Sequence, residues 1–314
     1  MSNAADGTLH VLTVHFNTPA LASSLVKCLP SQTPRGRRVV VHVLDNCSTP
    51  ENLRELRDNL AGLGTVTLHA SDRNIGFGAG INLLAGQNDI GSSDVLWLLN
   101  PDTRLEVGCL EQLETALDED YFDAVSPFIF SGDGDSAWVW YCGGDVDRLS
   151  VRVAHRLYGS ATASVPREAF ETEFMTGAAP MMRASVFRAV GGFPGDYFLY
   201  WEDAQFSWKA RELGLRLGVV PTARLWHAVG ASSGSGQSPT FYYWAARNRF
   251  VYARDTGVAL RKLIVGRGAL ETLRLIARAL REQDERTRKL RAAIRGTRDG
   301  IRQFSVSNMR TGES

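Results

Sequence analysis

Long hydrophobic runs are missing from this sequence of 314 residues. No stretch approaches the roughly 18 uninterrupted apolar residues that a membrane-spanning helix needs. Cysteine is also scarce, because the 4 cysteines are scattered and no two form a C-x-x-C pair. Without such pairs, and without a recognisable secretory leader, neither structural zinc nor a disulfide framework is favoured. We therefore expect a cytoplasmic protein that at most rests on the inner face of a membrane.

The formal net charge is also small, at +1, and a chain without an excess of positive charge is not expected to bind nucleic acid. The charge is unevenly distributed, since residues 258–304 hold 13 Lys or Arg against 5 Asp or Glu. Apolar side chains recur at helical spacing in the same segment, at Leu263, Leu270, Leu273, Ala277 and Leu280. We expect residues 258–314 to form a basic amphipathic helical tail. Such a tail either contacts an anionic membrane or packs on protein, on the preceding domain or in a homodimer.

Strand and helix patterns alternate over the first 130 residues. Apolar strands are predicted at residues 9–16, 39–44, 65–69 and 95–99, and helices from residue 19, at 50–63, after residue 76 and at 105–117. Further strands are predicted at residues 124–129, 173–183, 215–220 and 223–227, and helices at 202–213 and 242–254. This alternation predicts an α/β fold with a Rossmann-like, mostly parallel sheet, helices on both faces and a C-terminal helical extension.

Polar side chains follow several of these strands. Asn17, Asp45, residues 72–74 and Asp102 all come directly after a predicted strand. Ligands of open α/β sheets bind beyond the carboxyl ends of the strands. The sequence therefore predicts a ligand site at this edge of the sheet.

Asp102 stands in the turn after Asn100-Pro101. Its carboxylate suits a divalent cation that bridges two phosphates, although it also suits a cap of the following helix. His227 is the last residue of the strand predicted at 223–227. A lone histidine in such a place more often has a structural role than a ligand-binding one. If His227 folds back beside Asp102, the pair suits Mn as well as Mg.

Glu202 and Asp203 open a predicted helix directly after four apolar or aromatic residues. Carboxylates at a helix start commonly serve only the helix dipole. Among aromatic side chains, however, the pKa of a carboxylate rises towards that of a useful general base. We therefore favour a catalytic role for this pair.

The segment 73–80 has the pattern of a phosphate-binding turn that enters a helix. It is not a Walker loop, because G-x-x-x-x-G-K is absent. Asp45 suits a hydrogen bond to a nucleotide base or ribose, or alternatively a local Asx-turn. Trp140 and Tyr141 suit either a wall on which a sugar stacks or the hydrophobic core.

Taken together, the sequence resembles inverting glycosyltransferases of family 2, which have the type A nucleotide-binding fold, and within them the bacterial rhamnosyltransferase-like branch. The resemblance covers roughly residues 9–254. It rests on ordered motifs: LDNCS (44–48), NIGFGAGIN (74–82), LNPD (99–102), WYCGG (140–144), MTGA (175–178), GGF (191–193), ED (202–203), WH (226–227) and YYWAARNR (242–249).

This resemblance implies a role for each matching residue. The donor-binding residues are Asn17, Asp45, Arg73, Asn74, Gly76, Asn100 and Asp102. Asp102 and His227 are the implied ligands of a divalent cation, Mn or Mg. Asp203 is the implied base, with Glu202 beside it. Acceptor-side residues are Trp140, Tyr141, Gly177 and Trp201.

The implied reaction is transfer of a single sugar from a nucleotide sugar, of the dTDP-rhamnose or UDP-sugar type, to a glycan, lipid-linked or small-molecule acceptor. The Q-x-x-R-W motif of processive synthases is absent, and the usual D-x-D is here Asn-x-Asp. The expected catalytic domain spans residues 1–257, with a nucleotide-binding half to about residue 130 and an acceptor half at 131–257. Two alternatives stay open, a sugar nucleotidyltransferase and a non-catalytic glycan- or nucleotide-binding module.

Overall fold

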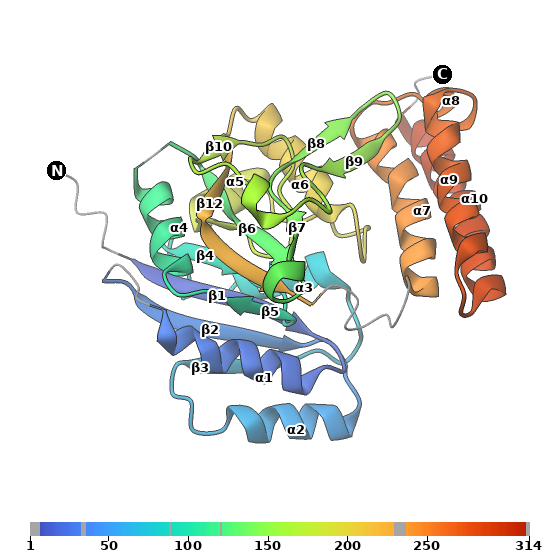
Figure 1. Cartoon of the computed structure of the whole chain (residues 1–314). Helices are drawn as coiled ribbons and strands as arrows, with labels where there is room; N and C mark the ends of the chain where they lie inside the picture. Colours follow the sequence, from blue (N-terminus) through green and yellow to red (C-terminus); the bar gives the residue numbers. More distant parts are fainter. Residues whose placement is uncertain (1–6, 33–35, 88, 120, 229–236, 312–314) are drawn as a thin grey trace.

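The computed structural model describes residues 7–32, 36–87, 89–119, 121–228 and 237–311 (Figure 1). Its strands are β1 (Thr8–His15), β2 (Arg38–Asp45), β3 (Val66–Ala70), β4 (Val95–Leu98), β5 (Thr103–Leu105), β6 (Ala124–Ser131), β7 (Trp138–Tyr141), β8 (Gly144–Asp147), β9 (Arg152–His155), β10 (Phe170–Glu171), β11 (Met181–Arg183) and β12 (Leu217–His227). Its α-helices are α1 (Pro19–Cys28), α2 (Pro50–Leu60), α3 (Phe77–Ala85), α4 (Cys109–Asp118), α5 (Ala184–Val190), α6 (Glu202–Glu212), α7 (Pro239–Asp255), α8 (Leu260–Ile264), α9 (Arg267–Arg281) and α10 (Arg286–Thr311). Short 3₁₀ turns lie at Leu29–Ser31, Gly134–Ser136 and Thr162–Ser164.

A central sheet has the strand order β10-β12-β6-β11-β4-β1-β2-β3. Strands β1 to β4 pair in parallel, and β12 pairs in parallel with β6. Strand β11 lies antiparallel between β4 and β6. The six strands β1, β2, β3, β4, β6 and β12 therefore run in one direction, as the sequence predicts, and their carboxyl ends share one edge.

Helices cover both faces of the sheet, which confirms the predicted α/β class (Figure 1). Strand β1 shows the cause, because Leu9 and Val11 face one core cluster while Leu12 faces another. Side chains of α1, α2 and α4 join the first cluster, and those of α3, α5 and α6 join the second. Alternating apolar residues thus bury both sides of the parallel strands.

Several predicted boundaries are wrong. The helix predicted from residue 105 begins at Cys109, because residues 103–105 instead form β5 against the end of β12. The strand predicted at residues 173–183 is limited to β11, since upstream backbone groups bond to side chains: the Met175 N–H, for example, donates to Ser207 Oγ. The two strands predicted at residues 215–227 form the single strand β12 with an irregularity between Val220 and Arg224. Most of the Gly/Ser-rich segment at residues 232–238 lies outside the described residues.

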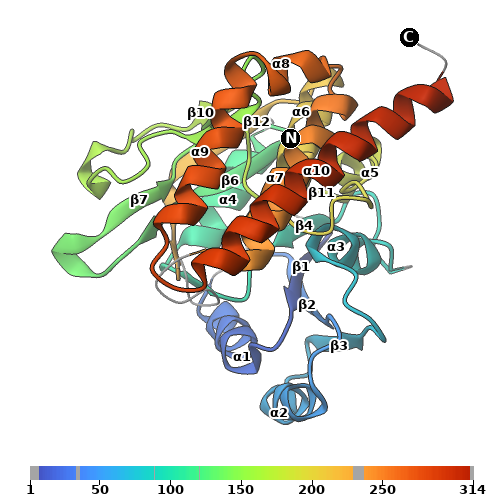
Figure 2. The ribbon, with the colours of Figure 1, turned by 90° about the vertical axis from the view of Figure 1, so that its right-hand side faces the viewer.

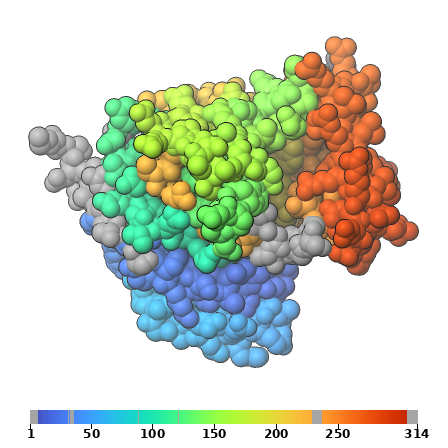
Figure 3. Space-filling model, in the orientation of Figure 1, coloured from blue at the N-terminus to red at the C-terminus, as the bar shows by residue number. Residues whose placement is uncertain are grey.

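The C-terminal helices pack on α7 at one side of the molecule (Figures 2 and 3). Small residues allow this close approach, because a Cβ added to Gly296 would lie 2.2 Å from the Tyr243 carbonyl oxygen. Within the described ranges, no helix combines the length and apolar character needed to cross a membrane.

The apolar stripe predicted for this tail is packed only in part. Leu263 is buried in the core, whereas Leu270, Leu273 and Leu280 are 54%, 60% and 46% exposed. Helix α9 packs through Leu275, Ile276 and Ala279, which were not part of the predicted stripe. The tail therefore packs on the domain through Leu263 and through these other residues, and the three leucines of α9 stay exposed.

Candidate active site

A cavity of about 430 Å³ opens at the carboxyl edge of the sheet. Segments far apart in the sequence meet there: the turn after β4, the start of α6 and the end of β12. The lining includes many residues singled out in the sequence: Asn100, Asp102, Trp140, Gly177, Glu202, Asp203 and His227. Of the residues expected at this edge because they follow predicted strands, Asp102 lines the cavity, whereas Asn17, Asp45 and residues 72–74 do not.

Asp102 and His227 are neighbours because β5 pairs with β12, which places Thr103 opposite His227. The His227 Nε2 atom lies 3.1 Å from Asp102 Oδ1. The Trp140 ring packs on the imidazole with 4.4 Å between centroids. His227 Nδ1 is buried and has no hydrogen-bond partner among the described residues. The imidazole is thus held rigidly with Nε2 directed at the carboxylate.

This pair fits a hexacoordinate divalent cation. Neighbouring ligands on an octahedral ion, each about 2.1 Å from the metal, lie about 3 Å apart, which matches the observed distance. The described residues contain no group of three or more His, Cys, Asp or Glu arranged for a metal. Asp102 and His227 would therefore need further ligands from outside the described residues to hold such a cation.

Asp203 lies in the first turn of α6, with its carboxylate at the cavity. Its Oδ2 accepts a hydrogen bond from the Gly177 N–H at 3.2 Å, and its Oδ1 accepts one from the Ala204 N–H at 2.8 Å. Burial raises the pKa of Asp203 to about 6, although the N–H donors oppose that rise. A carboxylate with this pKa is ionised at neutral pH and accepts a proton readily.

Glu202 occupies a different environment. It is only 5% exposed, and its Oε2 has no hydrogen-bond partner in the described part of the chain. Burial, and then the charge of Asp203, raise the pKa of Glu202 well above its ordinary value. The protonated acid is therefore favoured at Glu202, and Asp203 is the better base of the two.

The backbone segment before α6 determines where these two carboxylates lie. Residues 198–201 directly precede α6, and φ is positive there at Phe198 (54°), Tyr200 (65°) and Trp201 (73°). Such φ values are costly for bulky residues and need support from the surroundings. The fully buried Asn248 of α7 supplies it, because its Nδ2 donates to the carbonyl oxygens of Tyr197, Leu199 and Tyr200 at 2.6, 2.8 and 2.9 Å.

Five predicted donor-binding residues lie outside the described lining of this cavity: Asn17, Asp45, Arg73, Asn74 and Gly76. Asn17 Oδ1 accepts a hydrogen bond from the Thr49 N–H, which joins the loops after β1 and β2. Asp45 accepts one from the Ser48 N–H at 3.1 Å, the local turn that the sequence left as an alternative. Arg73 is exposed. A role for these residues in donor binding remains a prediction.

Asn46 organises the turn before α3, and sequence reasoning gave it no role of its own. Its side chain donates to Asn74 Oδ1 and accepts from the Ile75 N–H. Gly76 follows with φ 85°, and a Cβ there would lie 2.2 Å from the Phe198 carbonyl oxygen. Glycine is therefore required at position 76 for the turn to contact the segment that leads into α6.

One prediction about an aromatic residue needs correction. Tyr141 is fully buried and its hydroxyl donates to the Phe174 carbonyl oxygen at 2.8 Å, so it belongs to the core and does not face a sugar. Trp201 lines a neighbouring cavity, and its acceptor-side role remains a prediction. His155, to which the sequence pattern gave no role, lines both cavities, and its Nδ1 donates to the Trp140 carbonyl oxygen at 2.8 Å. Burial lowers the pKa of His155.

No protein-family model matches this sequence, and no curated protein matches it. Solved structures do resemble it. GalNAc-T7 with UDP, GalNAc and Mn2+ matches 90% of this chain at 20% identity and a TM-score of 0.64. The chain spans 53% of that protein's length, about half.

The mannosyltransferase PcManGT from Pyrobaculum calidifontis, in complex with GDP-Man and Mn2+, matches 98% of this chain over 80% of its own, with 16% identity and a TM-score of 0.55. S. aureus TarS 1-349 with UDP-GlcNAc matches 97% of this chain over 92% of its own, with 16% identity and a TM-score of 0.52. At these identities the likeness concerns the fold. The chain has the type A glycosyltransferase fold.

Proposed function

We propose that this protein is an inverting glycosyltransferase of the family 2 type, which moves one sugar from a nucleoside-diphosphate sugar to an acceptor hydroxyl. One observation carries the proposal: in a type A fold, the Asp102–His227 pair and the Asp203 carboxylate line the same cavity. The Asp102–His227 pair is suited to bind a metal-bound diphosphate, and the Asp203 carboxylate is suited to act as the base. The resemblance to the rhamnosyltransferase-like branch suggests dTDP-rhamnose or a UDP-sugar as donor.

The proposed step is a single displacement at the anomeric carbon. Asp203 takes the proton of the acceptor hydroxyl while that oxygen forms a bond to the anomeric carbon. The bond between the anomeric carbon and the diphosphate oxygen breaks, and its electron pair leaves with the nucleoside diphosphate. One displacement inverts the configuration and needs one base, which agrees with the different environments of Asp203 and Glu202.

Asp102 and His227 would hold the divalent cation, Mn or Mg. When bound, such an ion neutralises charge that develops on the leaving diphosphate. Gly177 fixes the base through its N–H, and Trp140 fixes the imidazole of His227. GalNAc-T7 and PcManGT, both solved with Mn2+ and a nucleotide or nucleotide sugar, support this reading by their shared fold.

We also propose that residues 1–257 form the catalytic domain and that the tail contacts an anionic membrane. In support, the exposed stripe of Leu270, Leu273 and Leu280 is flanked by Arg267, Arg274 and Arg281. Apolar side chains with flanking cations are typical of helices that lie at a membrane interface.

A panel of nucleotide sugars tests the proposed reaction. UDP-, GDP- and dTDP-linked sugars are each added with Mn2+, with Mg2+ or with EDTA, and melting temperature and donor hydrolysis are measured. One donor should stabilise the protein, by about 2.7 kcal/mol at a hundredfold excess over Kd, and should be hydrolysed slowly to nucleoside diphosphate. Formation of a sugar 1-phosphate and nucleoside triphosphate from added pyrophosphate would indicate a nucleotidyltransferase. Binding without any turnover would indicate a binding module.

A further inference from the structure

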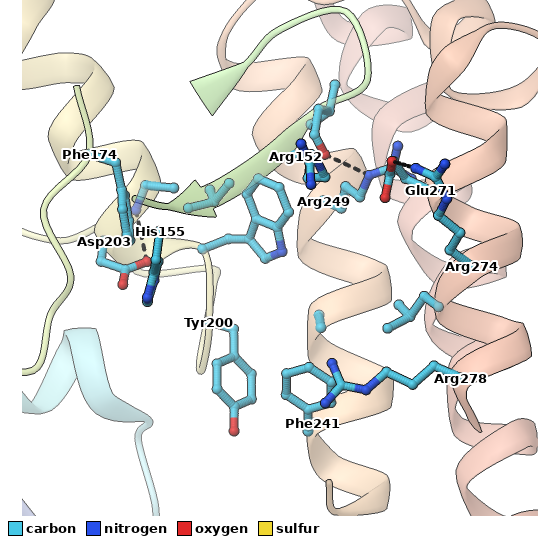
Figure 4. A pocket seen from close by; sticks show the side chains of 16 residues that line it. Arg152, His155, Phe174, Tyr200, Asp203, Phe241, Arg249, Glu271, Arg274 and Arg278 are labelled. Atoms are coloured by element: carbon cyan, nitrogen blue, oxygen red, sulfur yellow. Dashed lines mark hydrogen bonds and ion pairs between the residues drawn. The ribbon is translucent and has the colours of Figure 1, made fainter. Parts of the chain in front are cut away.

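A second cavity, of about 440 Å³, adjoins the first at Asp203; Figure 4 shows the residues that line it. Its walls come from β9, from the segment before α6, and from α7 and α9. It shares Asp203, His155, Tyr200 and Phe241 with the first cavity. The proposed base therefore stands at the boundary between the two cavities, where a donor on one side and an acceptor on the other would meet.

The part of this cavity near Asp203 is aromatic. Phe174, Tyr200, Trp201 and Phe241 line it, and Figure 4 shows Tyr200 and Phe241 between Asp203 and the arginines of α9. Flat aromatic rings offer an apolar surface with a polar edge, which suits a ligand that is part apolar and part hydroxylated. A sugar ring has that character.

The far side of the cavity is cationic. Arg152 of β9 and Arg274 and Arg278 of α9 line it, with Glu271 as a single carboxylate among them. Glu271 pairs with Arg274. The Arg278 guanidinium lies 5.7 Å from the centre of the Phe241 ring. Among the described residues, neither Arg152 nor Arg278 forms an ion pair with a carboxylate within 4 Å, although Asp147 interacts with Arg152 at longer range and the Tyr242 hydroxyl is hydrogen-bonded to Arg278.

Arg249, a fourth arginine, has a structural task. Its guanidinium is buried and donates to the carbonyl oxygens of Ser150, Val151 and Gly268 and to the Thr272 hydroxyl, at 2.5 to 2.8 Å. These bonds join β9 to α9 and hold the two cationic walls together. Arg249 is thus a positioning residue. The arginines whose side chains are exposed to the cavity are Arg152, Arg274 and Arg278.

We propose that this cavity binds the acceptor, and that the acceptor is a sugar bearing a phosphate or diphosphate on the side away from the reacting hydroxyl. The proposal rests on the proposed glycosyl transfer. The hydroxyl lies at Asp203, the ring lies among the aromatics, and the phosphate lies at Arg152, Arg274 and Arg278. Arginine is suited to phosphate because its planar fork donates two parallel hydrogen bonds. The C-terminal tail then contributes side chains of α9 to an acceptor site whose base, Asp203, belongs to the proposed catalytic domain of residues 1–257.

Acceptor series that share the sugar and differ in the group at C1 test this proposal. Glucose, galactose, mannose and N-acetylglucosamine are offered as neutral p-nitrophenyl glycosides, as 1-phosphates and as undecyl diphosphate esters, with the donor identified above. Wild-type protein should use a phosphorylated form at least tenfold better in kcat/KM than the matching neutral glycoside. Preference for the undecyl ester would identify a lipid-linked source, and equal use of the 1-phosphate a soluble one.

Two double variants locate the effect. In Arg274→Gln/Arg278→Gln the ratio of kcat/KM between phosphorylated and neutral acceptors should fall at least tenfold. The control Arg261→Gln/Arg302→Gln removes the same charge from exposed positions of the tail outside both cavities and should keep the wild-type ratio. Donor hydrolysis without any preference for phosphate, or the same ratio in both double variants, overturns the acceptor proposal alone. Absence of all donor turnover in wild-type protein overturns the proposed function and this proposal with it.

Discussion

The side-chain amide of Asn248 donates a 2.9 Å hydrogen bond to the carbonyl oxygen of Tyr200, a residue with φ of 65°. Through this and two similar bonds, helix α7 holds the backbone that leads into Glu202 and Asp203. The position of the proposed base thus depends on a buried residue that touches neither cavity.

Asn248→Ala should therefore lower both stability and turnover. Buried carbonyl oxygens left without a donor cost about 1–3 kcal/mol, and the strained segment loses its support. Urea denaturation should show the loss of unfolding free energy, and kcat should fall more than donor affinity because the donor side is untouched. An unchanged urea midpoint would contradict the role assigned to Asn248.

A second prediction concerns the cation. Asp102→Ala and His227→Ala should each abolish the rise in melting temperature that donor plus Mn2+ produces, because each removes one of two protein ligands. Asp133→Ala, which removes an exposed carboxylate with an 89% exposed side chain, is the matched control and should behave as wild type. Full donor stabilisation and activity in excess EDTA would show that this pair binds no essential metal.

A third prediction follows from three histidines on neighbouring strands. His42 Nε2 lies 2.9 Å from His10 Nδ1, and the His42 ring stacks on His69 with 5.7 Å between centroids. Burial, and then the positive charge of His10, lower the pKa of His42 to about 4, although Asp89 opposes the shift. Asp94 lies 3.4 Å from His10 on the other side.

Because the folded state resists protonation of His42 while the unfolded chain binds a proton near pH 6.5, this contribution to stability is present above pH 6.5. It is lost as pH falls towards 4, by about 2 kcal/mol between pH 7 and pH 5. Unfolding free energies at these two pH values should therefore differ more in wild type than in His42→Leu. Equal pH dependence in the two proteins would refute this.

The fourth prediction concerns the exposed leucines of α9. Wild-type protein should sediment with vesicles of phosphatidylcholine and phosphatidylglycerol at low salt, and less at high salt. Leu270→Ser/Leu273→Ser should reduce this binding without loss of stability, because both side chains are more than half exposed. The control is Leu83→Ser/Leu213→Ser, at exposed positions outside the tail (40% and 53%). Concentration-dependent dimerisation, lost in the first variant, would instead assign the stripe to a second copy of the chain.

The sequence allowed the fold class and one part of the site to be predicted. Apolar strands followed by polar residues placed Asp102 at a sheet edge with Asn17, Asp45 and residues 72–74, since parallel strands end together, but only Asp102 of these lines the cavity. The pairing of Asp102 with His227 needed β5, a strand of three residues that local pattern does not distinguish from the start of a helix. Short strands depend on partners distant in sequence, which local propensity does not contain.

Other features were beyond sequence reasoning for related reasons. The roles of Asn248 and His155 depend on tertiary contacts with segments about 50 and 15 residues away. Tyr141 and Trp140 are adjacent in the sequence, yet strand alternation directs only Trp140 to the cavity. In the tail, helical spacing was correct, but the contact between α7 and α10 depends on glycines such as Gly296, which allow the two helices to approach closely and which an apolar pattern does not identify.

The most direct test of the account is the rate of sugar transfer by Asp203→Asn, measured against pH with the identified donor and a phosphorylated acceptor. The substitution removes a proton acceptor but little volume, so transfer should fall roughly a hundredfold to ten-thousandfold with donor affinity nearly intact. In wild type, kcat/KM should rise with pH through about 6, as Asp203 ionises, and then level off. Glu202→Gln, which alters the neighbouring buried acid, should keep this pH profile. Near-normal transfer by Asp203→Asn, with loss of transfer in Glu202→Gln instead, would contradict the assignment of the base.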